Sequence, residues 1–322
     1  MVQEIILNNP KDKFQNIATI GNFDGLHIAH QMLIRSVYLN TTKFGKGKSM
    51  VISFEPHPKA LYGEAPKLLI DRKTKREFIE NYLHIDEYIE LEFNRELADM
   101  SPEEFVKKIL VERFHLDVVI VGFNFTFGKN ASGNAELLTE LCAKEGIKVT
   151  IADNVTNNMG IISSSKIREM LYEGDIVTVN KCLSYWYNFR GEIIKCKQNG
   201  RKLGFPTANI LIPEDRAVPP YGVYAVRAIV DGKTYPGIAN LGVKPTVSDE
   251  NKLMLETHLF NYIDLRGDLY GKEIQVFLYE FMRPEQKFAS VEELRKTIKE
   301  NINEARLKMI HLKGNKHLPI EK

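Results

Sequence analysis

The sequence is poor in cysteine and has no long apolar run. Its three cysteines, Cys142, Cys182 and Cys196, are widely spaced and form no Cys-x-x-Cys pair. This spacing argues against a disulfide framework or a cysteine-based zinc site. No stretch approaches the ~20 apolar residues that a membrane span needs, and the first residues carry no apolar core of a secretory signal. We therefore expect a cytoplasmic protein that does not associate with a membrane.

The sequence also has almost no net charge. Its 44 Lys and Arg residues nearly balance 42 Asp and Glu residues, for a formal charge of +2. This balance gives no electrostatic case for a nucleic-acid partner. With 322 residues, 43% of them hydrophobic, the chain exceeds the ~250–300 residues at which a single core usually stops growing. Two domains are expected.

Strand and helix patterns alternate through the first half of the chain, which predicts an α/β doubly wound parallel sheet of Rossmann-like type. Ser101, Pro102 and Glu104 form a strong helix start, because they suit the N-cap, N1 and N3 positions. The predicted strands cover residues 17–20, 50–54, 87–91, 118–121 and 147–151. The predicted helices cover residues 27–44, 73–83, 102–114, 135–145 and 163–172.

The pattern changes after about Asn180. Residues 187–281 consist of short β-rich runs separated by Gly, Pro and Asn, which predicts a mainly antiparallel β-barrel or sandwich. A closing helix is predicted over residues 291–308, with Ser290 as its N-cap. We place the two domains at residues 1–182 and 183–322.

The densest motif in the first half is GNFDGLHIAH, from Gly21 to His30, directly after the first strand. A glycine-rich turn there lets the backbone approach a phosphate, and the following helix N-terminus offers N–H groups. His27 and His30 lie on one helix face and could stabilise charge on a transferring phosphorus. The alternative is a helix-capping turn with two incidental histidines.

A serine cluster opens the last helix of the first half. Ser163 and Ser164 supply hydroxyl groups, and Arg168 follows one turn later, where it can reach a phosphate. The alternative is an ordinary N-cap with a solvated arginine.

The second half has its own motif, GRKLGFPTAN, from Gly200 to Asn209. Gly200 and Gly204 let a loop fold closely over a ligand. Thr207 and Asn209 are two apart on an extended segment and point the same way, and their oxygens suit Mg²⁺. A Gly/Pro turn that enters a strand is the alternative.

The motifs of the first half resemble the nucleotidylyltransferase superfamily, in the version found in bacterial FAD synthetases. GNFDGLHIAH is similar to GxFDGxHxGH, and FEPHP at residues 54–58, GFNFTFG at 122–128 and SSSKIR at 163–168 resemble further motifs in the same order. The sequence departs from the usual pattern at Ala29, Asn124 and Thr126, where Gly, Asp and Arg are frequent. These three departures are the reason to consider a chain whose adenylation activity is weak.

This resemblance implies transfer of an adenylyl group from Mg-ATP to FMN, with release of pyrophosphate. His27 and His30 are the implied catalytic residues. The implied nucleotide- and phosphate-binding residues are Gly21, Asn22, Phe23, Asp24, Gly25, Ser163, Ser164 and Arg168, and the implied flavin-binding residues are His57, Pro58 and Asn124.

The second half resembles riboflavin kinases. GRKLGFPTAN is similar to GRxLGFPTAN, and resemblance continues at residues 221–224, 239–246, 256–259, 269–272 and 283–288, with Lys244 in place of the usual arginine. The resemblance implies Glu256 as general base toward the ribityl 5′-hydroxyl and Arg283 as a flavin contact. It further implies Mg²⁺ at Thr207 and Asn209, and nucleotide binding by Gly200, Lys202, Gly204 and Pro206.

Taken together, the resemblances imply an enzyme of bacterial bifunctional riboflavin kinase/FAD synthetase type, with ATP, riboflavin and FMN as its small-molecule substrates. Three alternatives stay open at the level of sequence: a riboflavin kinase with weak adenylation, a non-catalytic flavin-binding regulator, and an adenylyltransferase for another small phosphate. The sequence leaves the oligomeric state undetermined.

Overall fold

The chain forms two compact units, which we describe separately. The first comprises Met1–Pro66 and Arg72–Ser164, and the second comprises Lys67–Asp71 and Ser165–Lys322. The computed structural model describes residues 14–153, 155–157, 160–196, 199–245, 251–262 and 269–310. Thr246 of the sequence motif at residues 239–246 lies outside the described residues.

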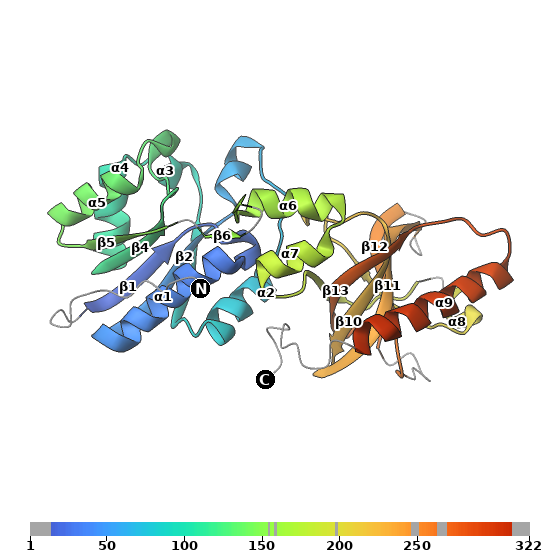
Figure 1. The fold of residues 1–322 in the computed structure, drawn as a ribbon. Coiled ribbons are helices and arrows are strands. Elements are labelled where there is room, and N and C mark those ends of the chain that lie inside the picture. Colours follow the sequence, from blue (N-terminus) through green and yellow to red (C-terminus); the bar gives the residue numbers. More distant parts are fainter. Residues whose placement is uncertain are drawn as a thin grey trace. The chain divides into compact units, whose positions relative to one another are not determined.

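A five-stranded parallel sheet forms the centre of the first unit (Figure 1). Its order is β3-β2-β1-β4-β5, so β1 lies between β2 and β4 and the chain reverses direction across the sheet there. The sheet confirms the predicted doubly wound fold. Its strands are β1 (Phe14–Ile20), β2 (Gly45–Glu55), β3 (Glu87–Glu92), β4 (Val118–Gly122) and β5 (Lys148–Ala152); a separate hairpin pairs β6 (Thr156–Asn157) with β7 (Gly160–Ile161).

Helices cover the sheet because its strands alternate their side chains between two faces. Ala18 and Ile20 of β1 belong to one apolar core cluster with Leu138 and Leu141 of α5. Ser101 caps the helix after it as predicted: it accepts from the Glu104 amide while Glu104 bonds back to the Ser101 amide. The helical segments are η1 (Asp24–Leu26), α1 (Ile28–Phe44), η2 (Pro58–Tyr62), α2 (Arg72–Glu77), η3 (Phe78–Tyr82), α3 (Arg95–Ala98), α4 (Pro102–Phe105), η4 (Val106–Arg113), η5 (Lys129–Ala131) and α5 (Ala135–Lys144).

A six-stranded antiparallel sheet forms the second unit, in the order β8-β13-β10-β11-β12-β9. A single antiparallel bridge between Ile194 and Asn209 links its two edges, so the sheet is a nearly closed barrel, as predicted. Its strands are β8 (Asn188–Glu192), β9 (Ala208–Leu211), β10 (Gly222–Val230), β11 (Lys233–Pro245), β12 (Asn251–Leu259) and β13 (Glu273–Pro284).

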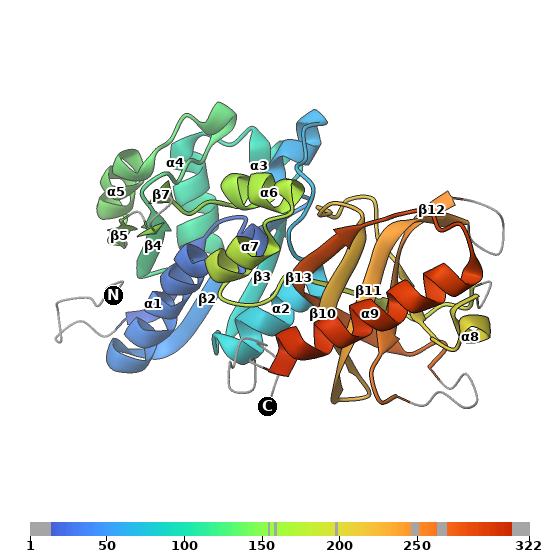
Figure 2. The same ribbon diagram turned by 45° about the vertical axis from the view of Figure 1, so that its right-hand side comes forward.

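The predicted closing helix is α9 (Val291–Ile310), which lies along the barrel (Figure 2). Ser290 Oγ accepts a hydrogen bond from the Glu293 amide at 3.1 Å. Ile302, Ala305 and Met309 of α9 share a core with Val223, Ala225 and Ile238 of β10 and β11.

Two helices of the second unit were not predicted. After α6 (Ser164–Glu173), Gly174 takes φ +86° and α7 (Ile176–Leu183) begins, capped by Asp175 Oδ1, which accepts from the Thr178 amide at 3.1 Å. A single turn, α8 (Asn199–Leu203), forms in the glycine-rich loop.

Candidate active sites

The GNFDG turn lies at the carboxyl end of β1, where the strand order of the sheet reverses. Ligands of doubly wound sheets bind at this position. The turn bends sharply, because Phe23 (φ 49°), Gly25 (φ 77°) and Leu26 (φ 41°) all take left-handed backbone angles. For Phe23 and Leu26 these angles cost about 1 kcal/mol or more each, so other contacts must hold the turn.

Side chains from three elements bind the carbonyl groups of this turn. Lys75 Nζ of α2 donates to the Asn22 carbonyl at 2.5 Å, and Ser164 Oγ of α6 donates to the Asp24 carbonyl at 2.8 Å. Gln31 Nε2 of α1 donates to the Leu26 carbonyl at 2.6 Å. These bonds compensate the negative ends of the peptide dipoles, which would otherwise repel an anionic ligand.

His27 and His30 lie directly against one another at the start of α1. Their rings stack with centroids 3.5 Å apart and an interplanar angle of 21°. Burial lowers the pKa of His27 to about 4. Burial, followed by the charges of His27 and Lys75, lowers the pKa of His30 well below its usual value. Both rings are therefore neutral at physiological pH in the absence of ligand.

A neutral imidazole can still donate one hydrogen bond. His27 Nδ1 faces the His30 amide at 3.4 Å, which assigns the proton of the neutral His27 ring to Nε2. His30 Nδ1 and Asn22 Oδ1 are buried and lack hydrogen-bond partners among the described residues. Buried polar atoms without partners are uncommon and indicate a place for a ligand or water.

The serine cluster and the glycine turn come together, as the sequence motifs imply. Ser164 binds the turn at the Asp24 carbonyl, and Ser163 directly precedes it. Arg168 lies one helical turn beyond Ser164, and its Nε donates to the Lys67 carbonyl at 2.7 Å. Part of the Arg168 guanidinium thus holds the chain segment before α2.

The remaining predicted residues of this half follow β2 and β4. His57 and Pro58 are partly buried after the end of β2, and His57 Nδ1 accepts from the Lys59 amide at 3.2 Å as the N-cap of η2. Asn124 is exposed in the turn after β4. All three residues follow strands at the same sheet edge as the glycine turn.

The turn after β4 is tight. The Phe125 amide donates to the Gly122 carbonyl at 3.0 Å, and a side chain on Gly122 would approach Asn124 Oδ1 at 3.3 Å. The backbone of Gly122 therefore holds Asn124 close to the end of the strand. A flavin or phosphate contact from Asn124 stays a prediction.

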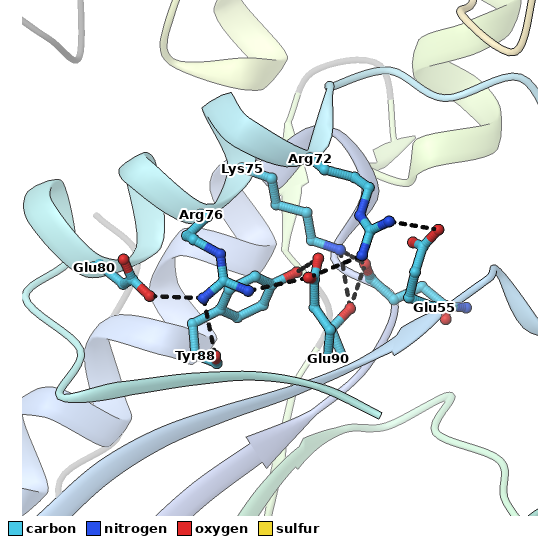
Figure 3. A network of polar contacts seen from close by, with 9 residues as sticks. Glu55, Arg72, Lys75, Arg76, Glu80, Tyr88 and Glu90 are labelled. Atoms are coloured by element: carbon cyan, nitrogen blue, oxygen red, sulfur yellow. Dashed lines mark hydrogen bonds and ion pairs between the residues drawn. The ribbon is translucent and has the colours of Figure 1, made fainter. Parts of the chain in front are cut away.

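A charged network at this edge was not predicted from the sequence (Figure 3). Arg72 and Arg76 of α2 both pair with Glu90 Oε2 of β3, at 3.2 and 3.0 Å. Between them in sequence, Lys75 donates to the Asn22 carbonyl and to Ser53 Oγ, the latter at 2.9 Å. The available signals were the basic run of α2 and a glutamate, Glu90, between the apolar residues Ile89 and Leu91 of β3.

The second candidate site lies on three neighbouring strands of the barrel. Glu256 of β12 stands directly opposite Asn240 of β11 on one side and Asn209 of β9 on the other. Directly paired residues of antiparallel strands place their side chains on the same face. The barrel thus brings together three residues that are far apart in the sequence.

The Glu256 carboxyl group has a raised pKa. Burial is the main cause, and Glu285 adds to it, whereas Lys244 and a hydrogen bond from Asn240 act in the opposite direction. Lys244 Nζ and Asn240 Nδ2 also bind Glu285 Oε1, at 2.6 and 3.1 Å. A carboxylate with a raised pKa binds protons more strongly, as a general base requires.

The glycine-rich loop folds tightly beside this carboxylate. The Phe205 amide donates to the Gly200 carbonyl at 2.8 Å, and a side chain on Gly200 would approach the Phe205 carbonyl at 2.5 Å. Gly204 takes φ +87°, which favours glycine. Lys202 is exposed, and the Pro206 carbonyl lies 2.9 Å from His258 Nδ1.

Thr207 and Asn209 offer oxygens that fit a magnesium ion. Thr207 directly precedes β9, and the buried Asn209 Oδ1 has no hydrogen-bond partner among the described residues. In the described part of the chain, no cluster of three or more His, Cys, Asp or Glu side chains is suited to a metal ion. Neutral hydroxyl and amide oxygens of this kind are suitable ligands for a hard cation.

Arg283 lies at the end of β13, beside Glu285. Its Nε donates to Asn301 Oδ1 of α9 at 2.9 Å, and its guanidinium lies 5.7 Å from the centre of the Phe288 ring. Burial lowers the pKa of Arg283, although Glu285 opposes this effect. The structure thus shows Arg283 fixing the segment before α9, and a flavin contact stays a prediction.

The first site presents a backbone turn with neutral ring donors, and the second a buried carboxylate beside neutral oxygens. Both arrangements suit charge stabilisation at phosphorus, where positioning and electrostatics dominate. The fold and the two sites define a transferase of phosphate-containing groups.

Comparisons with known proteins agree with this class. Residues 9–166 match the family model described as FAD synthetase, and residues 183–309 match that described as riboflavin kinase. A bifunctional riboflavin kinase/FMN adenylyltransferase of Listeria monocytogenes is 34% identical over 281 residues, covering 86% of this chain and 87% of the relative. One from Bacillus subtilis is 32% identical over 302 residues, covering 92% and 93%. The chain belongs to the family of bifunctional riboflavin kinase/FMN adenylyltransferases.

A solved structure shares the fold over nearly the whole chain. It is a crystal structure from Streptococcus pneumoniae, described as a macrolide-efflux protein, with a TM-score of 0.79 and 25% sequence identity. The match covers 94% of this chain and 98% of that one.

Within the described residues of this chain, every helix is too short or too polar to cross a membrane.

Proposed function

We propose that the two reactions of this family take place at the two sites described above. Riboflavin is phosphorylated to FMN beside Glu256 in the barrel, and FMN is adenylated to FAD beside the His27–His30 turn. Two contacts support the assignment, one at each site: Ser164 binds the Asp24 carbonyl, and Glu256 is in register with Asn209.

In adenylation, an oxygen of the FMN phosphate attacks the α-phosphorus of ATP, and pyrophosphate leaves. The turn from Gly21 to Gly25 receives the nucleotide phosphates, and the ring N–H groups of His27 and His30 donate to the oxygens on which charge accumulates. Neutral rings suit this role because they donate without the cost of burying two like charges. Ser163, Ser164 and Arg168 bind the leaving phosphates, and His57, Pro58 and Asn124 contact the flavin.

In phosphorylation, the ribityl 5′-hydroxyl oxygen attacks the γ-phosphorus of ATP, and ADP leaves. Glu256 accepts the hydroxyl proton, while Asn240 orients its carboxylate. Thr207 and Asn209 would hold a magnesium ion, which would neutralise charge on the phosphate oxygens. Gly200, Lys202, Gly204 and Pro206 enclose the nucleotide, and Arg283 contacts the flavin.

A pair of single substitutions tests the assignment. We expect Glu256→Ala to abolish FMN formation from riboflavin and Mg-ATP while FAD still forms from supplied FMN. We expect His30→Ala to do the reverse. Both products are separated by chromatography. If either variant, still folded, lost both activities or neither, the two-site assignment would be wrong.

Matched controls come from exposed positions. Glu292 lies in the first turn of α9, and His115 lies before β4, at the sheet edge opposite the glycine turn. Glu292→Ala and His115→Ala should leave both activities intact. A loss in either control would point to nonspecific damage instead of a role in the reaction.

A further inference from the structure

A lysine outside every recognised motif, Lys75, supports the glycine turn through a hydrogen bond to its backbone. Lys75 is on α2, and its ammonium group spans the Asn22 carbonyl at 2.5 Å and Ser53 Oγ at 2.9 Å. Ser53 Oγ in turn lies 3.3 Å from the same carbonyl. Lys75 thus ties the turn after β1 to the neighbouring strand β2.

The neighbours of Lys75 on α2 have a different role. Arg72 and Arg76 pair with Glu90, and Arg72 also lies 3.5 Å from Glu55. Figure 3 shows the Lys75 side chain extending between Arg72 and Arg76. Its ammonium group reaches the Asn22 carbonyl of the turn. The Tyr88 ring lies beside it, with its centre 5.8 Å from Nζ. The arginines and carboxylates thus surround the lysine with fixed groups that direct its ammonium to the turn.

The bond to Asn22 falls where the turn needs support. The next residue, Phe23, takes a left-handed backbone angle, and its ring contacts His30 edge-on with centroids 5.3 Å apart. If the Asn22 carbonyl moved, Phe23 could relax, and the ring that packs against His30 would move with it. A charged donor to a carbonyl is about twice as strong as a neutral one.

We propose that Lys75 is a positioning residue for adenylation: its ammonium group fixes the Asn22 carbonyl and so keeps the turn and His30 in the arrangement that receives the nucleotide phosphates. This role rests on the proposed adenylation site. Lys75 acts through the turn, without contacting the reacting atoms.

The charge state of Lys75 makes the proposal testable by pH. Burial lowers its pKa to about 8. The titratable groups that face it from its own and neighbouring elements are Asp24, His30, Glu55, Arg72 and Glu90, and the Tyr88 ring lies beside it. As pH rises through about 8, the ammonium group loses its proton and the bond to Asn22 becomes a weaker neutral one. Adenylation should therefore decline above that pH.

The experiment measures FAD formation from FMN and Mg-ATP by the full chain between about pH 6.5 and pH 9.5, on both sides of the Lys75 pKa of about 8. Lys75→Met should lower the rate about tenfold or more, since a charge-assisted hydrogen bond is lost, and its residual activity should show no inflection near pH 8. Lys75→Arg should restore much of the rate and keep it at alkaline pH, because arginine stays charged. Lys73→Met, on the exposed side of the same helix, is the matched control.

Two outcomes would overturn the proposal. One is adenylation by Lys75→Met within about twofold of the Lys73→Met control, well short of the tenfold loss expected for a charge-assisted bond. The other is an unchanged alkaline inflection in Lys75→Met, which does not depend on whether the arginine variant folds. The His30→Ala variant distinguishes failure of this proposal from failure of the proposed site. If His30→Ala still adenylates FMN, the site itself is wrong. If His30→Ala loses adenylation but Lys75→Met does not, only the role of Lys75 is refuted.

Discussion

Replacing Glu256 with glutamine tests the proposed kinase chemistry most directly. Glutamine keeps the size of the side chain and can still bind Asn240, so the packing of the three strands should survive. It cannot accept the proton of the attacking hydroxyl. General bases contribute about 10²–10⁴-fold, which corresponds to about 3 to 5 kcal/mol on the activation barrier. We expect Glu256→Gln to slow FMN formation by this factor.

The assay follows FMN formation from riboflavin and Mg-ATP under single-turnover conditions, so that product release does not mask the chemical step. FAD formation from supplied FMN in the same chain serves as the internal control. A fall of less than about tenfold, below the usual range for a general base, would refute Glu256 as the base. So would an equal loss of both activities.

The pH dependence of the kinase reaction provides an independent check. Burial raises the pKa of Glu256, and Lys244 opposes that effect. The basic form is lost as pH falls through the raised pKa, so FMN formation should fall on the acid side. Lys244→Met removes the opposing charge and should move this acid limb to higher pH, whereas Lys252→Met, an exposed lysine on β12, should not. An unmoved or lower limb would contradict this electrostatic account.

Two further predictions concern stability. The folded-state pKa of Glu256 lies above its usual value, so ionisation of Glu256 destabilises the fold as pH rises through the usual pKa. Glu256→Gln should therefore unfold at the same or a higher temperature than the wild type near neutral pH. A clearly lower unfolding temperature would contradict this. Arg216 is buried, lies 3.4 Å from Asp71 and donates to the carbonyls of Leu69 and Asn188. Arg216→Met should lower the free energy of unfolding by about 3 kcal/mol or more in chemical denaturation. The control is Arg295→Met, at an exposed site on α9. A loss of stability in Arg216→Met no greater than that in Arg295→Met would refute this prediction.

Much of the architecture could be predicted from local sequence patterns. The apolar run before Gly21, the buried strand from Val118, and the capping residues Ser101 and Ser290 each report short-range preferences, and the structure confirms them. Helix α7 was missed because Ile176, Val177 and Val179 are β-branched and favour strands by propensity. Capping by Asp175 and burial of Ile176 and Val179 outweigh that preference.

The sequence by itself determined the order of the two folds and the motifs that end at His30 and begin at Gly200, because turns, caps and periodicity depend on neighbouring residues. Only the tertiary structure decided which distant groups meet. Lys75 binds the Asn22 carbonyl, and Glu256 lies between Asn209 and Asn240. The physical reason is that strand register and helix packing depend on the burial of the whole core, which no short segment encodes.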